Sequence, residues 1–129
     1  QVVLPLLKTD LLTVMQAVTN ETLAETNVEF MDKNACCVIM ASKGYPQKYD
    51  KGFEMIIPKE IANNVYVAGA SFKDNKLVTN GGRVLGATAV SETLEDAIKN
   101  AYEMVKTISF ENAYYRNDIG QKALKAKGE

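Results

Sequence analysis

The hydrophobic positions of the chain recur at helical spacing in two segments. In the first, residues 9–19, Thr9 and Asp10 can cap the start of a helix. The next apolar positions form a single stripe: Leu11, Leu12, Met15 and Val18. The pattern predicts an amphipathic helix that ends near Asn20.

The second helical segment is the clearest element of the sequence. Thr93, with Asp96 three residues later, is typical of a capped helix start. An apolar stripe then repeats at i, i+3 and i+4 spacing: Leu94, Ala97, Ile98, Ala101, Val105 and Ile108. We expect a helix over residues 94–107. The acids at its start, Glu92, Glu95 and Asp96, favour the helix dipole and are not expected to act as acids or bases.

Between the two helices the pattern changes to that of strands. Residues 35–41 are apolar on both faces, which predicts a strand that is covered on both sides. Shorter strands are expected over residues 53–57, 65–72, 77–79 and 84–90. Asp74 and Asn75 predict a hairpin turn at residues 73–76. A second tight turn is expected at residues 80–82, because its two glycines tolerate positive φ.

The order of these elements predicts an α+β fold. The connections between strands are too short for crossovers, so the pairing should be antiparallel. A polar stretch at residues 21–27 is the expected domain boundary, with residues 28–129 forming the second unit. In the tail, Tyr114, Tyr115 and Ile119 can pack, whereas residues 122–129 are charged and expected to fray.

Composition narrows the function classes. The chain has 129 residues, 24% of them charged, and a net charge of −1, which gives no basic surface for nucleic acid. No apolar run reaches the ~20 residues that a membrane span needs. The two cysteines, Cys36 and Cys37, are adjacent and should point to opposite faces, which argues against a disulfide and favours a reducing, cytoplasmic setting. Histidine is absent, so a Ser-His-Asp or Cys-His site is excluded, and zinc chemistry is nearly so.

The best candidate for chemistry is the turn Asn80-Gly81-Gly82-Arg83. Two glycines let a ligand approach backbone N–H groups, and an arginine fork suits a carboxylate or phosphate. The alternative is a tight hairpin turn whose arginine pairs with a surface carboxylate, because the pattern is neither a P-loop nor a Rossmann fingerprint.

Two other segments are weaker candidates. The loop from Gly44 to Gly52 could face a phosphate through Lys48 and Lys51, although Tyr45 and Tyr49 favour an ordinary packed connection. In the tail, Arg116 and Asp118 could serve a ligand or could simply brace the chain. Within this sequence nothing assembles a nucleophile, a base and an oxyanion site, so we identify no catalytic residue and no metal ligand.

Four ordered motifs resemble the C-terminal domain of phosphoribosylamine–glycine ligases, members of the ATP-grasp ligases. They are Leu77-Val78-Thr79-Asn80-Gly81-Gly82-Arg83-Val84-Leu85-Gly86, Gly44-Tyr45-Pro46 with Tyr49, Lys51 and Gly52, Thr93-Leu94-Glu95-Asp96-Ala97 with Ala101-Tyr102, and Tyr114-Tyr115-Arg116-Asn117-Asp118-Ile119-Gly120. The resemblance covers essentially the whole chain. It departs from the family at Val67-Ala68-Gly69-Ala70, where histidine-alanine-glycine-threonine is usual, and at Gln47, where glycine is common.

The resemblance implies a function in purine biosynthesis. Such an enzyme uses ATP and Mg²⁺ (or Mn²⁺) to join phosphoribosylamine to glycine, whose carboxylate is activated as an acyl phosphate. Gln1 would be the last residue of the family's metal-binding segment, and Leu4-Pro5 with Lys8-Thr9-Asp10-Leu11 matches the segment that comes next in the family. The metal ligands, the ATP-binding lobes and the N-terminal domain would therefore precede residue 1.

The resemblance also implies an architecture for each part of the chain. Residues 1–27 would be a helical remnant of the ATP-grasp domain, and residues 28–129 a small, antiparallel, barrel-sandwich-like domain with a packed helix. The substrate-binding residues would be Asn80, Gly81, Gly82 and Arg83. This piece alone is expected to be inactive and to hold no cofactor.

A different class of function stays open. Barrel-sandwich domains also carry lipoyl or biotinyl groups on a hairpin lysine, and Lys73 and Lys76 flank the turn at Asp74 and Asn75. No hydrophobic or methionine neighbours frame these lysines as in carrier motifs. A protein-binding module without catalysis is the third alternative.

Overall fold

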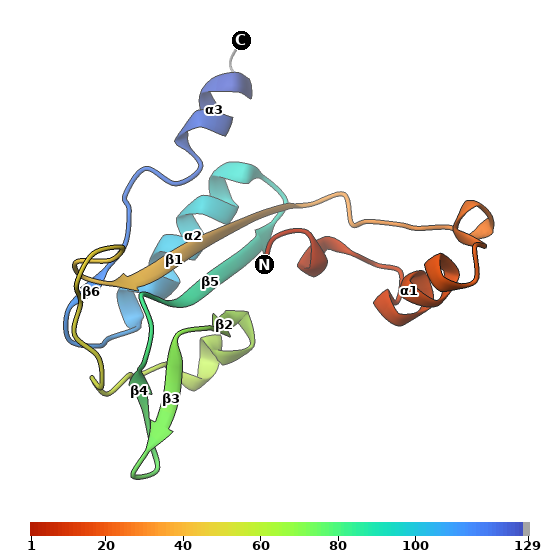
Figure 1. The fold of residues 1–129 in the computed structure, drawn as a ribbon. Coiled ribbons are helices and arrows are strands. Elements are labelled where there is room, and N and C mark those ends of the chain that lie inside the picture. Colours follow the sequence, from red (N-terminus) through yellow and green to blue (C-terminus); the bar gives the residue numbers. More distant parts are fainter. Residues whose placement is uncertain (128–129) are drawn as a thin grey trace.

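A computed structural model describes residues 1–127, in which a long helix lies across one face of an antiparallel sheet (Figure 1). The strands are β1 (Asn34–Ser42), β2 (Val65–Val67), β3 (Ala70–Lys73), β4 (Lys76–Thr79), β5 (Arg83–Ser91) and β6 (Ala113–Tyr114). The larger sheet has the order β2-β5-β1-β6, and β3 with β4 forms a separate hairpin. The predicted α+β class and antiparallel pairing are confirmed, but the two sheets of residues 1–127 do not close into a barrel.

Both predicted helices are present. They are α1 (Leu11–Thr19) and α2 (Leu94–Thr107), and three short 3₁₀ turns accompany them: η1 (Leu4–Leu6), η2 (Leu23–Glu25) and η3 (Lys59–Asn64). Thr93 starts α2 as predicted, since its Oγ1 accepts a hydrogen bond from the Asp96 N–H at 3.1 Å. None of the helices in residues 1–127 has the length and hydropathy needed to cross a bilayer.

The core lies between α2 and the sheet. The helix contributes Ala97, Ala101 and Val105, each at most 1% exposed, and the two alanines let it approach the strands closely. The strands contribute Val38, Met40, Val84, Leu85 and Ala87. Burial alternates along β1, so only the face toward α2 is fully covered, and the prediction of a strand covered on both sides is wrong. We call the other side the open face of the sheet.

The two cysteines follow the same alternation of buried and partly exposed positions along β1. Cys36 is buried and Cys37 is partly exposed, and both thiols are free, as the sequence predicts. Burial raises the pKa of the Cys36 thiol, which therefore stays protonated at neutral pH.

Two of the predicted strands differ from expectation. The segment 65–72 is broken at Ala68 and Gly69, whose N–H groups both donate to the Val84 carbonyl at 2.9 Å. This bend lets β2 pair with β5 while β3 pairs with β4. The segment 53–57 is not a strand, because it makes only isolated bridges, from Glu54 to Val78 and from Ile56 to Ser109.

The C-terminal part is more ordered than the sequence indicates. Residues Gln121–Lys127 form α3, so the expectation of a frayed end is wrong for them, and residues 128–129 lie outside the described part. Tyr115 and Ile119 pack against the core, as predicted, whereas Tyr114 is 55% exposed.

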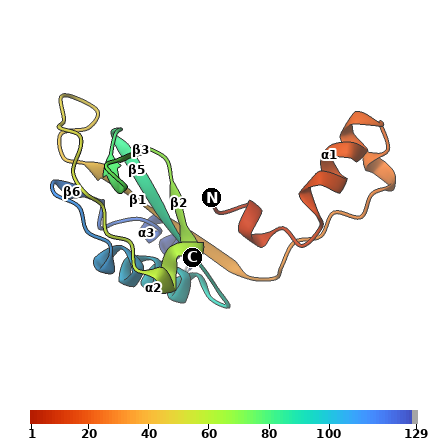
Figure 2. The same cartoon turned by 90° about the horizontal axis from the view of Figure 1, so that it is seen from below.

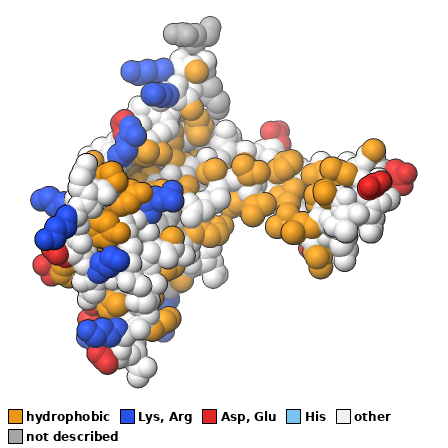
Figure 3. Space-filling model, in the orientation of Figure 1, with side chains coloured by type: hydrophobic (Ala, Val, Ile, Leu, Met, Phe, Trp, Pro, Cys, Tyr) orange, Lys and Arg blue, Asp and Glu red, His pale blue; other side chains and the backbone are white. Residues whose placement is uncertain are grey.

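The N-terminal segment up to Met31 forms an arm that projects away from the sheet (Figures 1 and 2), although Gln1 itself lies against β5, where its carbonyl accepts from the Thr88 hydroxyl at 2.9 Å. Backbone hydrogen bonds join the outgoing and returning segments of the arm, from Lys8 N–H to the Glu29 carbonyl at 2.9 Å and from Met31 N–H to the Leu6 carbonyl at 2.7 Å. The predicted stripe of α1 is exposed: Leu11 at 42%, Leu12 at 62%, Met15 at 59% and Val18 at 57%. Figure 3 shows hydrophobic side chains gathered along this arm.

Candidate functional site

Arg83 lies on the open face of the sheet because of an irregularity between β1 and β5. Met40 lies opposite Leu85, but Ala41 lies opposite Arg83, so Val84 is an extra residue in β5. In an unbroken ladder Arg83 would instead lie opposite Ser42, which is 1% exposed on the face toward α2. This β-bulge therefore turns a charged side chain out of the core, a common use of bulges beside functional sites.

The turn that precedes Arg83 differs from the prediction in two ways. It does not close a hairpin, because β4 pairs with β3 and β5 pairs with β1 and β2. Among the glycines of residues 1–127, positive φ is found at Gly44, Gly52 and Gly120, and neither Gly81 nor Gly82 adopts it. The residues instead carry the chain from the small sheet to the large one.

The glycines of this turn are required by close packing. A Cβ at Gly81 would lie 2.9 Å from Gly69 Cα, and a Cβ at Gly82 would lie 2.0 Å from Tyr45 Cδ2. A Cβ at Gly69 would in turn lie 2.4 Å from the Arg83 carbonyl oxygen. The backbone before Arg83 is thus sandwiched between the β2–β3 bend and an aromatic ring.

Ser42 fixes the turn from the end of β1. Its N–H donates to the Gly82 carbonyl at 2.8 Å, and its hydroxyl donates to the Gly81 carbonyl at 3.1 Å. Both carbonyls therefore point toward β1. Within residues 1–127 the N–H groups of Gly81 and Gly82 donate to no protein acceptor, and of these two residues only Gly82 lines the cavity described next.

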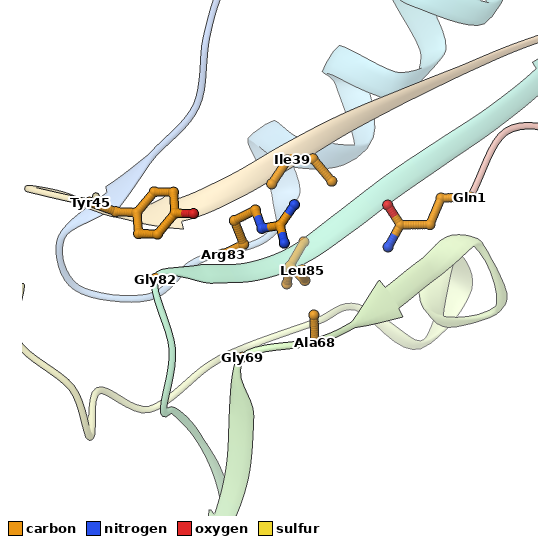
Figure 4. Close-up of a pocket in the computed structure, with 8 residues that line it drawn as sticks. All are labelled: Gln1, Ile39, Tyr45, Ala68, Gly69, Gly82, Arg83 and Leu85. Carbon is orange, nitrogen blue, oxygen red and sulfur yellow. The ribbon is translucent and has the colours of Figure 1, made fainter. Parts of the chain in front are cut away.

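A cavity of about 450 Å³ opens on this side of the sheet. Its lining is drawn in Figure 4 and consists of Gln1, Ile39, Tyr45, Ala68, Gly69, Gly82, Arg83 and Leu85. The Arg83 side chain extends along the open face in the direction of Gln1, and Tyr45 lies on the opposite side of Arg83. Among residues 1–127 Arg83 has no carboxylate partner, so its fork of donors faces the cavity unpaired.

The structure therefore brings only part of the predicted turn to the cavity. Gly82 and Arg83 line it, whereas Asn80 and Gly81 do not. The Asn80 N–H donates to the Gly69 carbonyl at 2.8 Å, which holds the β2–β3 bend against the turn.

The loop from Gly44 to Gly52 contributes one of its two tyrosines, and neither of its lysines, to the lining of the cavity. Tyr45 lines the cavity, but Lys48 and Lys51 do not, and Lys51 Nζ lies 5.8 Å from the centre of the Tyr49 ring. Gly44 adopts a φ of +101°, and a Cβ there would lie 2.3 Å from the Lys48 carbonyl oxygen. Tyr49 packs edge-on against Tyr45, with ring centroids 6.1 Å apart.

In the tail, Arg116 and Asp118 bond to each other. Arg116 Nε donates to the Asp118 carboxylate at 2.8 Å, and this hydrogen bond raises the pKa of Arg116 and lowers that of Asp118. The sequence left two roles open for these residues, and the pairing matches a bracing role.

Several lining residues were missed by sequence reasoning. Gln1, Ile39 and Gly69 lie far apart in the sequence and meet only through the sheet register and the β2–β3 bend. The sequence offered one signal, the pair Ala68-Gly69 inside an otherwise regular strand, which is typical of a bend or a close backbone approach.

The comparison with protein families matches residues 35–122 to the family described as phosphoribosylglycinamide synthetase, C domain. A phosphoribosylamine–glycine ligase of Caldanaerobacter subterraneus is 49% identical over 120 residues, which are 92% of this chain and 29% of that protein. A bifunctional purine biosynthetic protein of Dictyostelium discoideum is 49% identical over 129 residues, which are 96% of this chain and 16% of that protein.

A solved structure is also similar to this chain. It is a crystal structure of phosphoribosylamine–glycine ligase from Thermotoga maritima, with a TM-score of 0.68 and 37% identity. The match covers 81% of this chain and 27% of that one. The chain thus spans less than a third of the ligases that it matches.

The contact between Gly82 and Tyr45 can be tested by a double-mutant cycle. Gly82→Ala should destabilise the fold by about 1–3 kcal/mol, because the new methyl group overlaps the Tyr45 ring. In a Tyr45→Ala background most of this loss should disappear, as measured by urea unfolding of all four proteins. Equal losses in both backgrounds would show that the ring does not press on Gly82.

Proposed function

We propose, because the chain belongs to the phosphoribosylglycinamide synthetase C-domain family, that it forms the C-terminal part of a phosphoribosylamine–glycine ligase. In this proposal the complete enzyme joins phosphoribosylamine and glycine with ATP to form glycinamide ribonucleotide in purine biosynthesis. The support comes from relatives of that name, of whose length the chain spans about 29%.

The observation that carries the proposal is the position of Arg83. An unpaired guanidinium lies at the wall of a cavity of about 450 Å³, next to Gly82, whose N–H donates to no acceptor in residues 1–127. Such a group of donors suits a phosphate or a carboxylate. The phosphate of phosphoribosylamine and the carboxylate of glycine both satisfy that requirement.

We assign substrate binding to Asn80, Gly81, Gly82 and Arg83. Arg83 and Gly82 contact the anion directly, and Asn80 and Gly81 complete the turn that holds them in place. Tyr45 closes one end of the cavity and limits the access of water, which strengthens charge interactions inside it. The role of this chain is therefore to bind and orient an anionic substrate.

ATP and the metal are assigned to other parts of the enzyme. None of the residues that line the cavity is Asp or Glu, the side chains through which proteins usually hold Mg²⁺ together with substrate phosphates, so this lining does not fit a Mg²⁺ site. We propose that ATP and Mg²⁺ (or Mn²⁺) are held by an ATP-grasp domain outside this sequence.

We further propose that residues 1–27 are the end of that ATP-grasp domain and that residues 28–129 are the barrel-sandwich-like C-terminal domain, here with open sheets. The exposed stripe of α1 supports this division. Four large apolar side chains on one short helix, each more than 40% exposed, are typical of a surface that another domain covers.

The alternative of a cofactor carrier receives no support from the hairpin. Lys76 Nζ bonds to Glu54 at 2.7 Å, and both side chains are largely exposed beside the small sheet. No observation favours a carrier over a ligand-binding domain.

If the proposed anion site is correct, Arg83→Ala should weaken the binding of an anionic ligand. Ribose 5-phosphate, which shares the phosphoribosyl group of the substrate, should bind the 129-residue chain in calorimetry. Arg83→Ala should weaken that binding by about 1–3 kcal/mol, or roughly 5- to 150-fold, because a charged hydrogen bond is lost. Lys51→Ala removes the same charge outside the cavity and should change binding little. Equal losses in both variants would mean that only net charge attracts the ligand.

A chimera tests the assignment to a ligase. The chain should restore glycinamide ribonucleotide formation when it replaces the matching 29% of the Caldanaerobacter ligase, although the chain alone should form no product. Arg83→Ala in the chimera should lower kcat/KM, and Lys51→Ala is the control. A folded but inactive chimera, or turnover by the chain alone, would contradict the assignment.

A further inference from the structure

A second hollow of about 220 Å³ adjoins the first on the open face. It is lined by Ile39, Ala41, Tyr45, Tyr114, Tyr115, Arg83 and Arg116. Three of these residues, Ile39, Tyr45 and Arg83, also line the larger cavity. Arg83 and Tyr45 therefore stand at the boundary between two hollows that form one groove.

The second hollow exists because a small side chain lies between two large ones on neighbouring strands. Ala41 of β1 lies between Tyr114 of β6 and Arg83 of β5, and all three residues share the open face. Neighbouring strands are about 4.8 Å apart, so Tyr114 and Arg83 stand about 10 Å apart across a single methyl group. The small side chain of Ala41 leaves a slot between an aromatic ring and a guanidinium.

The slot suits a planar ring. Stacked aromatic pairs have centroids about 4.5–7 Å apart, so a span of about 10 Å admits one flat group between the two walls. Arginine also stacks on aromatic faces. The second arginine of the lining, Arg116, is already bonded to Asp118, so the cationic group available to a ligand is the one at the boundary, Arg83.

The chain that follows Tyr114 is held in place before any ligand binds. The Tyr102 hydroxyl donates to the Arg116 carbonyl at 2.7 Å and accepts from the Ile119 N–H at 3.0 Å. Tyr115 packs against the Tyr102 ring, with centroids 6.2 Å apart. These contacts fix the backbone next to Tyr114, whose own ring is 55% exposed and therefore accessible to a base.

We propose that the groove binds a nucleoside 5′-monophosphate, with the phosphoribosyl part in the larger cavity at Arg83 and the base in the slot over Ala41. The inference rests on the proposed function for the phosphoribosyl half and adds a base subsite to it. A nucleotide in this position shares Arg83 with the phosphoribosyl substrate, so the two ligands compete.

The test compares AMP with ribose 5-phosphate, which differ by the base. AMP should bind the 129-residue chain roughly 5- to 150-fold more tightly in calorimetry, which is the gain expected from one base stacked on an aromatic side chain. Tyr114→Ala should reduce AMP binding to the level of ribose 5-phosphate, and Tyr114→Phe should keep the difference. Phe72→Ala, which removes a ring that is 79% exposed on β3, is the matched control and should have no effect.

A second variant blocks the slot without removing the wall. Ala41→Leu should abolish the advantage of AMP and leave the binding of ribose 5-phosphate unchanged. Equal affinities for AMP and ribose 5-phosphate would overturn the base subsite while leaving the proposed anion site in place. An AMP advantage that survives both Tyr114→Ala and Ala41→Leu would also overturn it. Failure of ribose 5-phosphate to bind at all counts against the proposed function itself.

Discussion

The register shift between β1 and β5 decides on which face of the sheet Arg83 lies. The two strands pair regularly from Asn34 to Met40. One extra residue in β5 then places Arg83 opposite Ala41, where a regular ladder would place it opposite Ser42. A buried, unpaired guanidinium would cost several kcal/mol. The bulge avoids that cost and at the same time delivers the charge to a cavity. The position of Arg83 at the cavity is therefore a consequence of one local irregularity.

Close backbone contacts hold the bulge in place. Gly69 and Gly81 meet with no room for a side chain, and Gly82 lies under the Tyr45 ring. Ser42 binds both carbonyls of the turn from the end of β1. These contacts join the small sheet to the large one at the point where β5 begins. Because packing fixes the backbone of Arg83, little rearrangement of the chain would be needed to bind the anion that we propose for this site.

The parts of the fold that could be predicted from the sequence are those fixed by neighbouring residues. Thr93 and the apolar stripe after it define α2, and Asp74 with Asn75 defines the β3–β4 turn, because capping and turn formation depend on local chemistry. The bulge could not be predicted, since it depends on which residue of β1 lies opposite Arg83. The glycines of the turn were recognised, but for the wrong reason: their partners, Gly69 and Tyr45, are distant in sequence. The exposure of the apolar stripe of α1 could not be predicted either, because the periodicity of a helix does not show which surface covers it.

The central claim is that the bulge places Arg83 on the open face, and the pairing between β1 and β5 tests it most directly. Nuclear Overhauser contacts between backbone protons of the two strands report which residues lie opposite each other. We expect contacts that pair Met40 with Leu85 and Ala41 with Arg83. An unbroken ladder, with Ala41 opposite Val84 and Ser42 opposite Arg83, would contradict it.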